Sequence, residues 1–121
     1  MSYHEFEWKA GDGLSIFAQA WEPENPPKAV ICLVHGLGEH SGRYAHVAET
    51  LNQGGYAVIA SDLRGHGKSG GKRGHAPSFN AFMDDMAVLL NEAAQRYAGL
   101  PCFLWGHSLG GLLVSNYVLR R

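Results

Sequence analysis

Residues 102–111 read CFLWGHSLGG, and the prediction of the fold depends mainly on this stretch. Their first residues form an apolar run after Pro101, which is typical of a short buried strand. A Gly-x-Ser-x-Gly motif centred on Ser108 follows, and the next residues begin an apolar helix. A strand, a sharp turn that carries serine, and a helix together predict a nucleophile elbow, which lifts the serine hydroxyl clear of a sheet.

The residues beside Ser108 are expected to build this elbow. A side chain at Gly106 or Gly110 would collide with the neighbouring strand or helix. The helix N-terminus and the Leu109 N–H would lie beside the hydroxyl, where an oxyanion develops. His107 adjoins Ser108, but neighbouring side chains on a tight turn diverge. We therefore expect His107 to support the elbow structurally.

The chain before the elbow alternates between strand and helix patterns. Two period-2 segments joined by a glycine-containing turn predict an antiparallel hairpin, and continuous apolar runs predict strands buried on both faces. Apolar residues at helical spacing, with Gly54 after the first helix and Ser78 before the second, predict helices. The predicted strands are 3–9, 14–22, 29–34, 56–60 and 102–106, and the predicted helices are 44–51, 79–97 and 109–119.

These elements predict an α/β fold, and residues 1–121 suffice for one domain with a core but not for two. Alternating strand–helix units give a parallel sheet with helices on its faces. Functional loops lie at the carboxyl ends of such strands, so the glycine-rich turns after the central strands should converge on one edge. Those turns carry His35-Gly36, the segment from Asp62 to Gly67, and Ser108.

Composition and charge argue against several classes of function. With 45% hydrophobic residues, 17% charged residues and a net charge of −1, the chain has no basic excess for nucleic acid or anionic membranes. No run approaches the roughly 18–20 apolar residues of a membrane span, and the first residues lack a signal-peptide core. We expect a cytoplasmic protein with at most peripheral membrane contact. Cys32 and Cys102 lie in predicted buried strands and are expected to be reduced and slow to react.

Three motifs resemble those of a known family: HGLGEHSGRY at residues 35–44, DLRGHGKS at 62–69 and GHSLGG at 106–111. The chain is similar, along its whole length, to the α/β-hydrolase fold and to its monoacylglycerol lipase and lysophospholipase group. The resemblance implies hydrolysis of monoacylglycerol, lysophospholipid or related acyl esters through an acyl-enzyme on Ser108. It also implies an oxyanion hole formed by the N–H groups of Leu37 and Leu109, neighbouring strands for the two cysteines, and no cofactor or metal.

The chain departs from the family pattern after the serine. In this family the triad acid and histidine follow the serine, whereas residues 109–121 contain no Asp, Glu or His. The chain therefore resembles the N-terminal half of an enzyme, without the cap region and the later strands, and is expected to be inactive alone. An open apolar strand at 102–106 is a template for pairing, so we expect a homo-oligomer or a complementing C-terminal chain.

Several alternatives remain open at this point. The chain is either a serine ester hydrolase or a non-catalytic half-domain that folds or assembles only with a partner chain. His35 either orders its turn together with Gly36 or acts as the base for Ser108. Side chains within 62–66 are expected to hold their own loop, and those of 39–43 either shape a pocket rim or form a solvated loop.

Two binding sites of other classes receive little support. Residues 65–69 (GHGKS) resemble the end of a phosphate-binding loop, but Asp62 stands where that motif needs its first glycine, and Gly70-Gly71 follow where a helix should begin. The histidines show neither the His-Glu-x-x-His spacing nor the Cys-x-x-Cys partners of a metal site.

Overall fold

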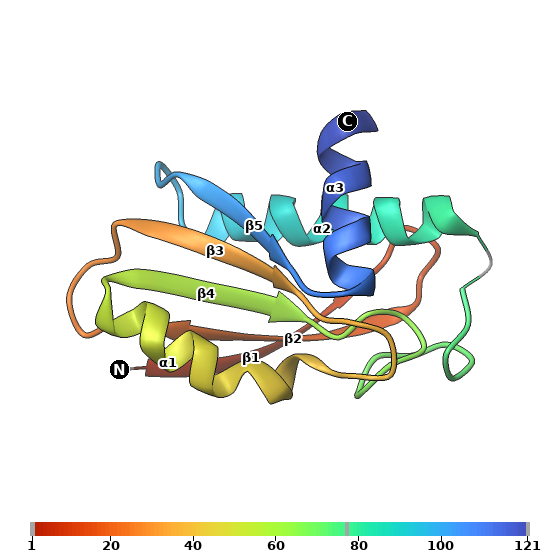
Figure 1. Ribbon diagram of the computed structural model, residues 1–121, viewed down its shortest axis with the longest axis horizontal. Coiled ribbons are helices and arrows are strands. Elements are labelled where there is room, and N and C mark those ends of the chain that lie inside the picture. Colours follow the sequence, from red (N-terminus) through yellow and green to blue (C-terminus); the bar gives the residue numbers. More distant parts are fainter. Residues whose placement is uncertain (1, 77, 121) are drawn as a thin grey trace.

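The computed structural model describes residues 2–76 and 78–120 (Figure 1). The alternating segments at the start of the chain form the predicted antiparallel hairpin, in which Ser2 lies opposite Glu22 and Lys9 lies opposite Ser15. The continuous apolar runs form the remaining strands. The strands are β1 (Ser2–Lys9), β2 (Ser15–Glu22), β3 (Ala29–Val34), β4 (Tyr56–Ser61) and β5 (Cys102–Gly106).

The predicted helices are present, with the expected residues at their ends. A 3₁₀ turn, η1 (Ser41–Tyr44), leads into α1 (Ala45–Gln53), and Gly54 caps that helix. The Ser78 hydroxyl accepts a hydrogen bond from the Ala81 N–H at 3.2 Å at the start of α2 (Phe79–Arg96). The apolar segment after the elbow forms α3 (Leu109–Arg120).

Within the described residues the strands form one sheet in the order β1-β2-β4-β3-β5. Both β4 and β5 pair in parallel with β3, so Ile31 lies between Val58 and Phe103. β2 pairs antiparallel with β4. The carboxyl ends of β3, β4 and β5 therefore share one edge of the sheet, as the sequence predicts.

Helices cover both faces of this sheet (Figure 1). On one face α1 contributes Ala48 to a cluster with Leu33 and Val58. On the other face α2 and α3 cover a larger cluster that includes Val30 and Ile59. Burying a Val, Leu, Ile or Met side chain contributes about 1.5–3 kcal/mol, so these clusters hold the layers together. The helix residues in the larger cluster are Met83, Met86, Leu89, Ala93 and Leu113.

β5 is the open edge strand that the resemblance predicts, and not the strand buried on both faces that its apolar run alone predicts. Among the described strands it pairs only with β3, and Phe103 and Trp105 are 54% and 37% exposed. Cys102 is exposed whereas Cys32 is fully buried, so the prediction of two buried thiols is wrong for Cys102. The physical reason is that an apolar run is buried on both faces only where further layers cover it, and β5 lies at a sheet edge.

None of the helices described here combines the length and the apolar composition needed to cross a bilayer.

Candidate active site

Ser108 lies at the junction between β5 and α3, in the turn that its motif predicts. Its φ is +58°, and in the described part of the chain no other non-glycine residue has a positive φ. Such a conformation is costly for a residue with a side chain and persists only where the surrounding structure enforces it. Ser108 is also exposed. The turn therefore has the geometry of a nucleophile elbow, with its serine open to solvent.

Both glycines of the motif are needed because three backbone segments meet at the elbow. A Cβ on Gly106 would lie 2.7 Å from the Gly111 nitrogen and would overlap the carbonyl of Gly110. A Cβ on Gly110 would lie 2.6 Å from the His35 carbonyl oxygen and would overlap that of Val34. The turn after β3, the end of β5 and the start of α3 thus approach more closely than any side chain permits.

The turn after β3 lies directly against the elbow. A Cβ on Gly36 would lie 3.2 Å from the Cβ of Ser108. The Gly36 N–H donates to Oε1 of Glu39 at 2.8 Å, and the Tyr44 hydroxyl donates to the same oxygen at 2.5 Å. The hydrogen bonds from Tyr44 and Gly36 lower the pKa of Glu39, so its carboxylate stays charged and holds the turn. Burial, followed by the bond to Glu39, raises the pKa of Tyr44 to about 12.

His107 contacts this same turn. Its Nδ1 lies 3.3 Å from the Tyr44 hydroxyl and 3.7 Å from Oε1 of Glu39, and its side chain is 62% exposed. The Tyr44 ring also packs edge-on against Trp105, with 5.5 Å between the ring centroids. These contacts connect the elbow to the turn after β3.

Near Ser108, neither the Leu37 N–H nor the Leu109 N–H donates a hydrogen bond to any acceptor within residues 2–76 and 78–120. Leu109 is the first residue of α3, and the first N–H groups of a helix lack intrahelical partners. Both residues border one hollow of about 380 Å³. The remaining walls come from the loop before α2 and from α2 itself, through His66, Gly74, His75, Ala76, Ser78, Phe79 and Phe82.

His35 is fully buried and both of its ring nitrogens are occupied. Its Nδ1 donates to the Gly36 carbonyl at 2.7 Å, and its Nε2 accepts from the Leu63 N–H at 2.9 Å. Burial lowers the pKa of the imidazole, which is therefore neutral in the folded chain. A general base needs a free lone pair within reach of the nucleophile. The geometry thus favours an ordering role for His35 over a role as base for Ser108.

Buried hydrogen bonds hold the turn after β4, as expected for residues 62–66. Asp62 accepts from the N–H and the hydroxyl of Ser41 at 2.7 and 2.6 Å. Arg64 donates to both carboxylate oxygens of Asp85 on α2, at 2.6 and 2.8 Å, and to Asp12 in the β1–β2 turn at 2.9 Å. These side chains are committed to the loop and to its neighbours.

Residues 65–69 do not form a phosphate-binding loop. The Lys68 N–H donates to the Asp62 carboxylate at 2.9 Å, so a negative charge already occupies the position that a phosphate would need. The Lys68 ammonium lies over the Phe17 ring, 4.8 Å from its centroid. The next helix begins only at Phe79.

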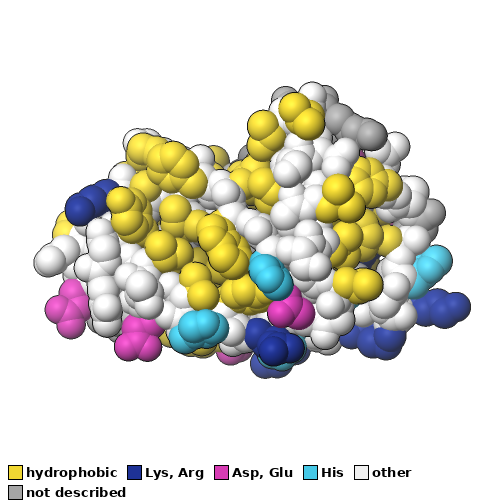
Figure 2. Space-filling view, viewed as in Figure 1, with side chains coloured by type: hydrophobic (Ala, Val, Ile, Leu, Met, Phe, Trp, Pro, Cys, Tyr) yellow, Lys and Arg dark blue, Asp and Glu magenta, His cyan; other side chains and the backbone are white. Residues whose placement is uncertain are grey.

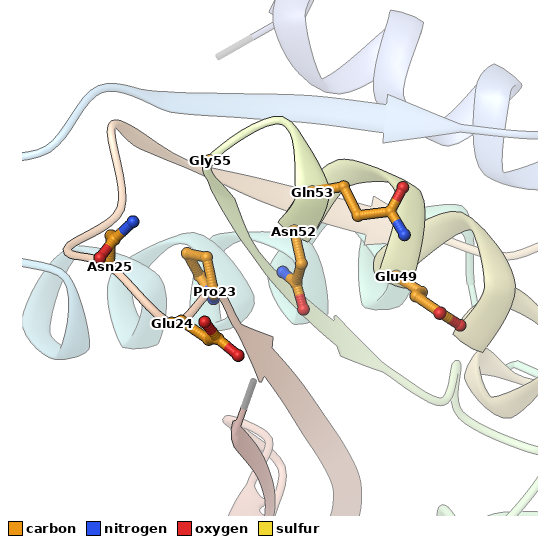
Figure 3. Close-up of a pocket in the computed structure, with 7 residues that line it drawn as sticks. All are labelled: Pro23, Glu24, Asn25, Glu49, Asn52, Gln53 and Gly55. Atoms are coloured by element: carbon orange, nitrogen blue, oxygen red, sulfur yellow. The ribbon is translucent and has the colours of Figure 1, made fainter.

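A second hollow lies at the opposite end of the sheet, before β4 (Figure 3). It measures about 340 Å³ and is lined by Pro23, Glu24, Asn25, Glu49, Asn52, Gln53 and Gly55. Its lining includes none of the residues predicted to act with Ser108. In the part of the chain that the structure describes, no group of three or more His, Cys, Asp and Glu side chains is placed to hold a metal ion.

The sequence motifs did not predict that Glu39 and Tyr44 order the turn after β3. A pattern that could have shown this is Gly-x-x-Glu directly before a helical segment. The Glu39 N–H donates to the Gly36 carbonyl at 3.2 Å while the Glu39 carboxylate accepts from the Gly36 N–H. This reciprocal pair resembles the capping box that often precedes a helix.

The chain matches known proteins over most of its length. Residues 25–121 match the family model described as serine aminopeptidase, S33. The chain is 43% identical over 108 residues to the monoacylglycerol lipase of Mycolicibacterium smegmatis, an alignment that covers 89% of this chain and 39% of that protein. It is 42% identical over 110 residues to the Homo sapiens monoglyceride lipase, with coverage of 91% and 36%.

A similar solved structure is that of a highly thermostable carboxyl esterase from Bacillus coagulans in complex with glycerol. It matches with a TM-score of 0.86 and 29% identity, over 99% of this chain and 41% of that one. The chain thus spans 39% and 36% of the lengths of the two curated relatives. Sequence family, sheet order and elbow geometry together establish that the chain belongs to the serine aminopeptidase S33 family and has the α/β-hydrolase fold.

Proposed function

We propose that this chain is part of a serine hydrolase of carboxylic esters, in which Ser108 is the nucleophile. The substrates are monoacylglycerols, lysophospholipids or related acyl esters. One observation carries the proposal. Ser108 has a left-handed backbone conformation, and Leu37 and Leu109, whose N–H groups would bind the oxyanion, border one hollow near it. The names of the two lipase relatives support the choice of lipid esters.

In the proposed reaction, Oγ of Ser108 attacks the carbonyl carbon of the ester and loses its proton to a base. The carbonyl oxygen becomes an oxyanion, which accepts hydrogen bonds from the N–H groups of Leu37 and Leu109. The alcohol then leaves with a proton, and water hydrolyses the acyl-enzyme. The apolar side chains of Leu37, Phe82 and Leu109 line the hollow and suit the hydrocarbon part of an ester.

The base and the acid that orients it are proposed to come from a second polypeptide. His35 is occupied by two hydrogen bonds, and Asp62 by those from Ser41 and Lys68. The exposed edge of β5 is the position at which a complementing segment would add further strands. The 121 residues alone are then expected to have negligible activity.

Complementation tests this proposal. The chain would be mixed with a polypeptide that corresponds to the carboxyl-terminal part of the M. smegmatis lipase and assayed with a monoacylglycerol, a lysophospholipid and a short-chain aryl ester. We expect hydrolysis by the mixture only, with a loss of about 10³-fold or more in Ser108→Ala. A fluorophosphonate probe should label Ser108 in the mixture.

Two controls separate this proposal from its alternatives. Ser115→Ala removes a hydroxyl that α3 carries away from the elbow, and it should leave the hydrolysis unchanged. An aminoacyl p-nitroanilide tests amide cleavage, which is expected to be absent. Turnover that survives Ser108→Ala would disprove the role of this serine, and Ser108-dependent turnover by the chain alone would show that the base lies within these 121 residues.

A further inference from the structure

The two cysteines of the chain meet across neighbouring strands, away from the elbow. β3 and β5 run side by side in Figure 1, and Cys32 lies opposite Leu104 while Cys102 lies opposite Val30. The cysteines are therefore offset by two residues, so both side chains project from the same face of the sheet. Their Sγ atoms are 3.3 Å apart, and both thiols are free.

The two thiols differ in access and in acidity. In the chain without a complementing segment, Cys32 is completely buried, whereas Cys102 is exposed at the sheet edge. The hydrogen bond from the Cys32 thiol stabilises a thiolate at Cys102 and lowers the pKa of Cys102 to about 7. The same hydrogen bond, together with burial, raises the pKa of Cys32, which stays protonated. Near neutral pH the pair thus contains an exposed nucleophile and a buried thiol beside it.

We propose that Cys32 and Cys102 form a redox modification site that reacts with hydroperoxides, with Cys102 as the attacking sulfur and Cys32 as the resolving one. The Cys102 thiolate attacks the terminal oxygen of the hydroperoxide, an S–O bond forms, and the O–O bond breaks. The released alkoxide takes a proton from water. Cys102 becomes a sulfenic acid, two electrons having passed from sulfur to the hydroperoxide.

The second step closes a disulfide between the strands. Sγ of Cys32 attacks the sulfenic sulfur, the S–O bond breaks, and the departing hydroxide leaves as water with the Cys32 proton. Because this sulfur already lies 3.3 Å away, ring closure competes well with attack by thiols from solution. In total, two thiols and one hydroperoxide give one disulfide, one alcohol and one water.

The position of Cys102 allows this closure and also makes the bond easy to reverse. The sulfurs must approach from 3.3 Å to about 2.05 Å. Because the two cysteines are offset by two residues, their Cα atoms lie farther apart than those of residues directly opposite each other on β3 and β5. Cys102 is the first residue of β5, which pairs only with β3 among the described strands, so a small shift of that strand end suffices. A bond that needs such a shift is strained and is readily reduced.

Intact mass and peptide mapping of the wild-type chain test the proposal. One equivalent of hydrogen peroxide at pH 7 should lower the mass by about 2 Da, remove both free thiols and yield one Cys32–Cys102 cross-linked peptide. Dithiothreitol should restore the original mass. In Cys32→Ser and Cys32→Ala, the reaction should stop at a Cys102 sulfenic acid that dimedone traps, and Cys102→Ser should react at least ten-fold more slowly.

Thiol alkylation gives a second readout that does not depend on oxidation. The rate at Cys102 should rise with pH around a midpoint near 7, and Cys32→Ala should move that midpoint up by more than one pH unit, toward the usual value of about 8.5. Circular dichroism confirms that each variant is folded. A wild-type chain that accumulates dimedone-trapped Cys102, or that gives only disulfide-linked dimers through Cys102, would overturn the proposal. These readouts are covalent and do not depend on ester hydrolysis.

Discussion

The turns after β3 and β4 and the segment formed by β5 and α3 meet at one edge of the sheet, yet they are held in different ways. The two turns bury polar and charged side chains, among them His35, Asp62 and Arg64, and give nearly all of them partners. The β5–α3 segment buries little. Figure 2 shows hydrophobic side chains gathered along β5 and over α3, where Phe103 is 54% and Leu119 is 84% exposed.

This difference shows which part of the site is complete in itself. A buried polar group costs free energy unless it is hydrogen-bonded, so the turns owe their shape to a closed set of donors and acceptors. The β5–α3 segment owes its shape to backbone contacts that only glycine allows at Gly106 and Gly110. Its apolar surface contributes to stability only when something covers it.

Breaking the charged network at Arg64 should have the largest effect. Arg64→Met leaves the Asp85 carboxylate, whose side chain is only 9% exposed, without its bidentate partner, and we expect a loss of about 3–5 kcal/mol in the free energy of unfolding. Asp12→Asn removes the other charge that contacts Arg64. The Asp12 side chain is 53% exposed and solvent screens its charge, so this control should cost far less than Arg64→Met. Both free energies of unfolding are measured by urea denaturation. Equal losses in the two variants would show that the deeper burial of Asp85 does not make its ion pair more important than that of Asp12.

Gly110 and Gly111, which are adjacent in α3, test the close contact between the turn after β3 and the β5–α3 segment. Gly110→Ala would place a Cβ against the carbonyls of Val34 and His35, and we expect a loss of about 2 kcal/mol or more. Gly111→Ala meets no atom closer than 3.4 Å and should gain up to about 1 kcal/mol from helix propensity. Denaturation followed by circular dichroism measures both. If the two alanines had the same effect, the close approach at the elbow would be refuted.

The smallest change in stability is expected for Phe103→Lys at the exposed edge, within about 0.5 kcal/mol. Its effect should instead appear in assembly, because a charge on an edge strand blocks pairing with another chain. We expect self-association, measured by light scattering against concentration, to weaken at least ten-fold. Tyr3→Lys places the same charge on β1 at the other edge and should leave association unchanged. A monodisperse wild-type monomer would contradict the predicted assembly through β5.

Sequence alone was sufficient for the elements and for their convergence. Period-2 alternation, continuous apolar runs and helical spacing depend on neighbours along the chain, and they placed each strand and each α-helix, but not the 3₁₀ turn η1, within a few residues of its bounds. The strained serine turn was also predictable, because Gly106 and Gly110 are local requirements of the turn between strand and helix.

Only the tertiary structure decided which distant groups meet. Arg64 reaches Asp12 and Asp85, which are 52 and 21 positions away in the chain, and Cys32 reaches Cys102 across 70 positions. Such pairs depend on strand order and register, which no local pattern encodes. For β5 the local pattern was misleading: its apolar residues predicted burial, although the resemblance predicted an open edge, because burial is a property of the layers that cover a strand and not of the strand itself.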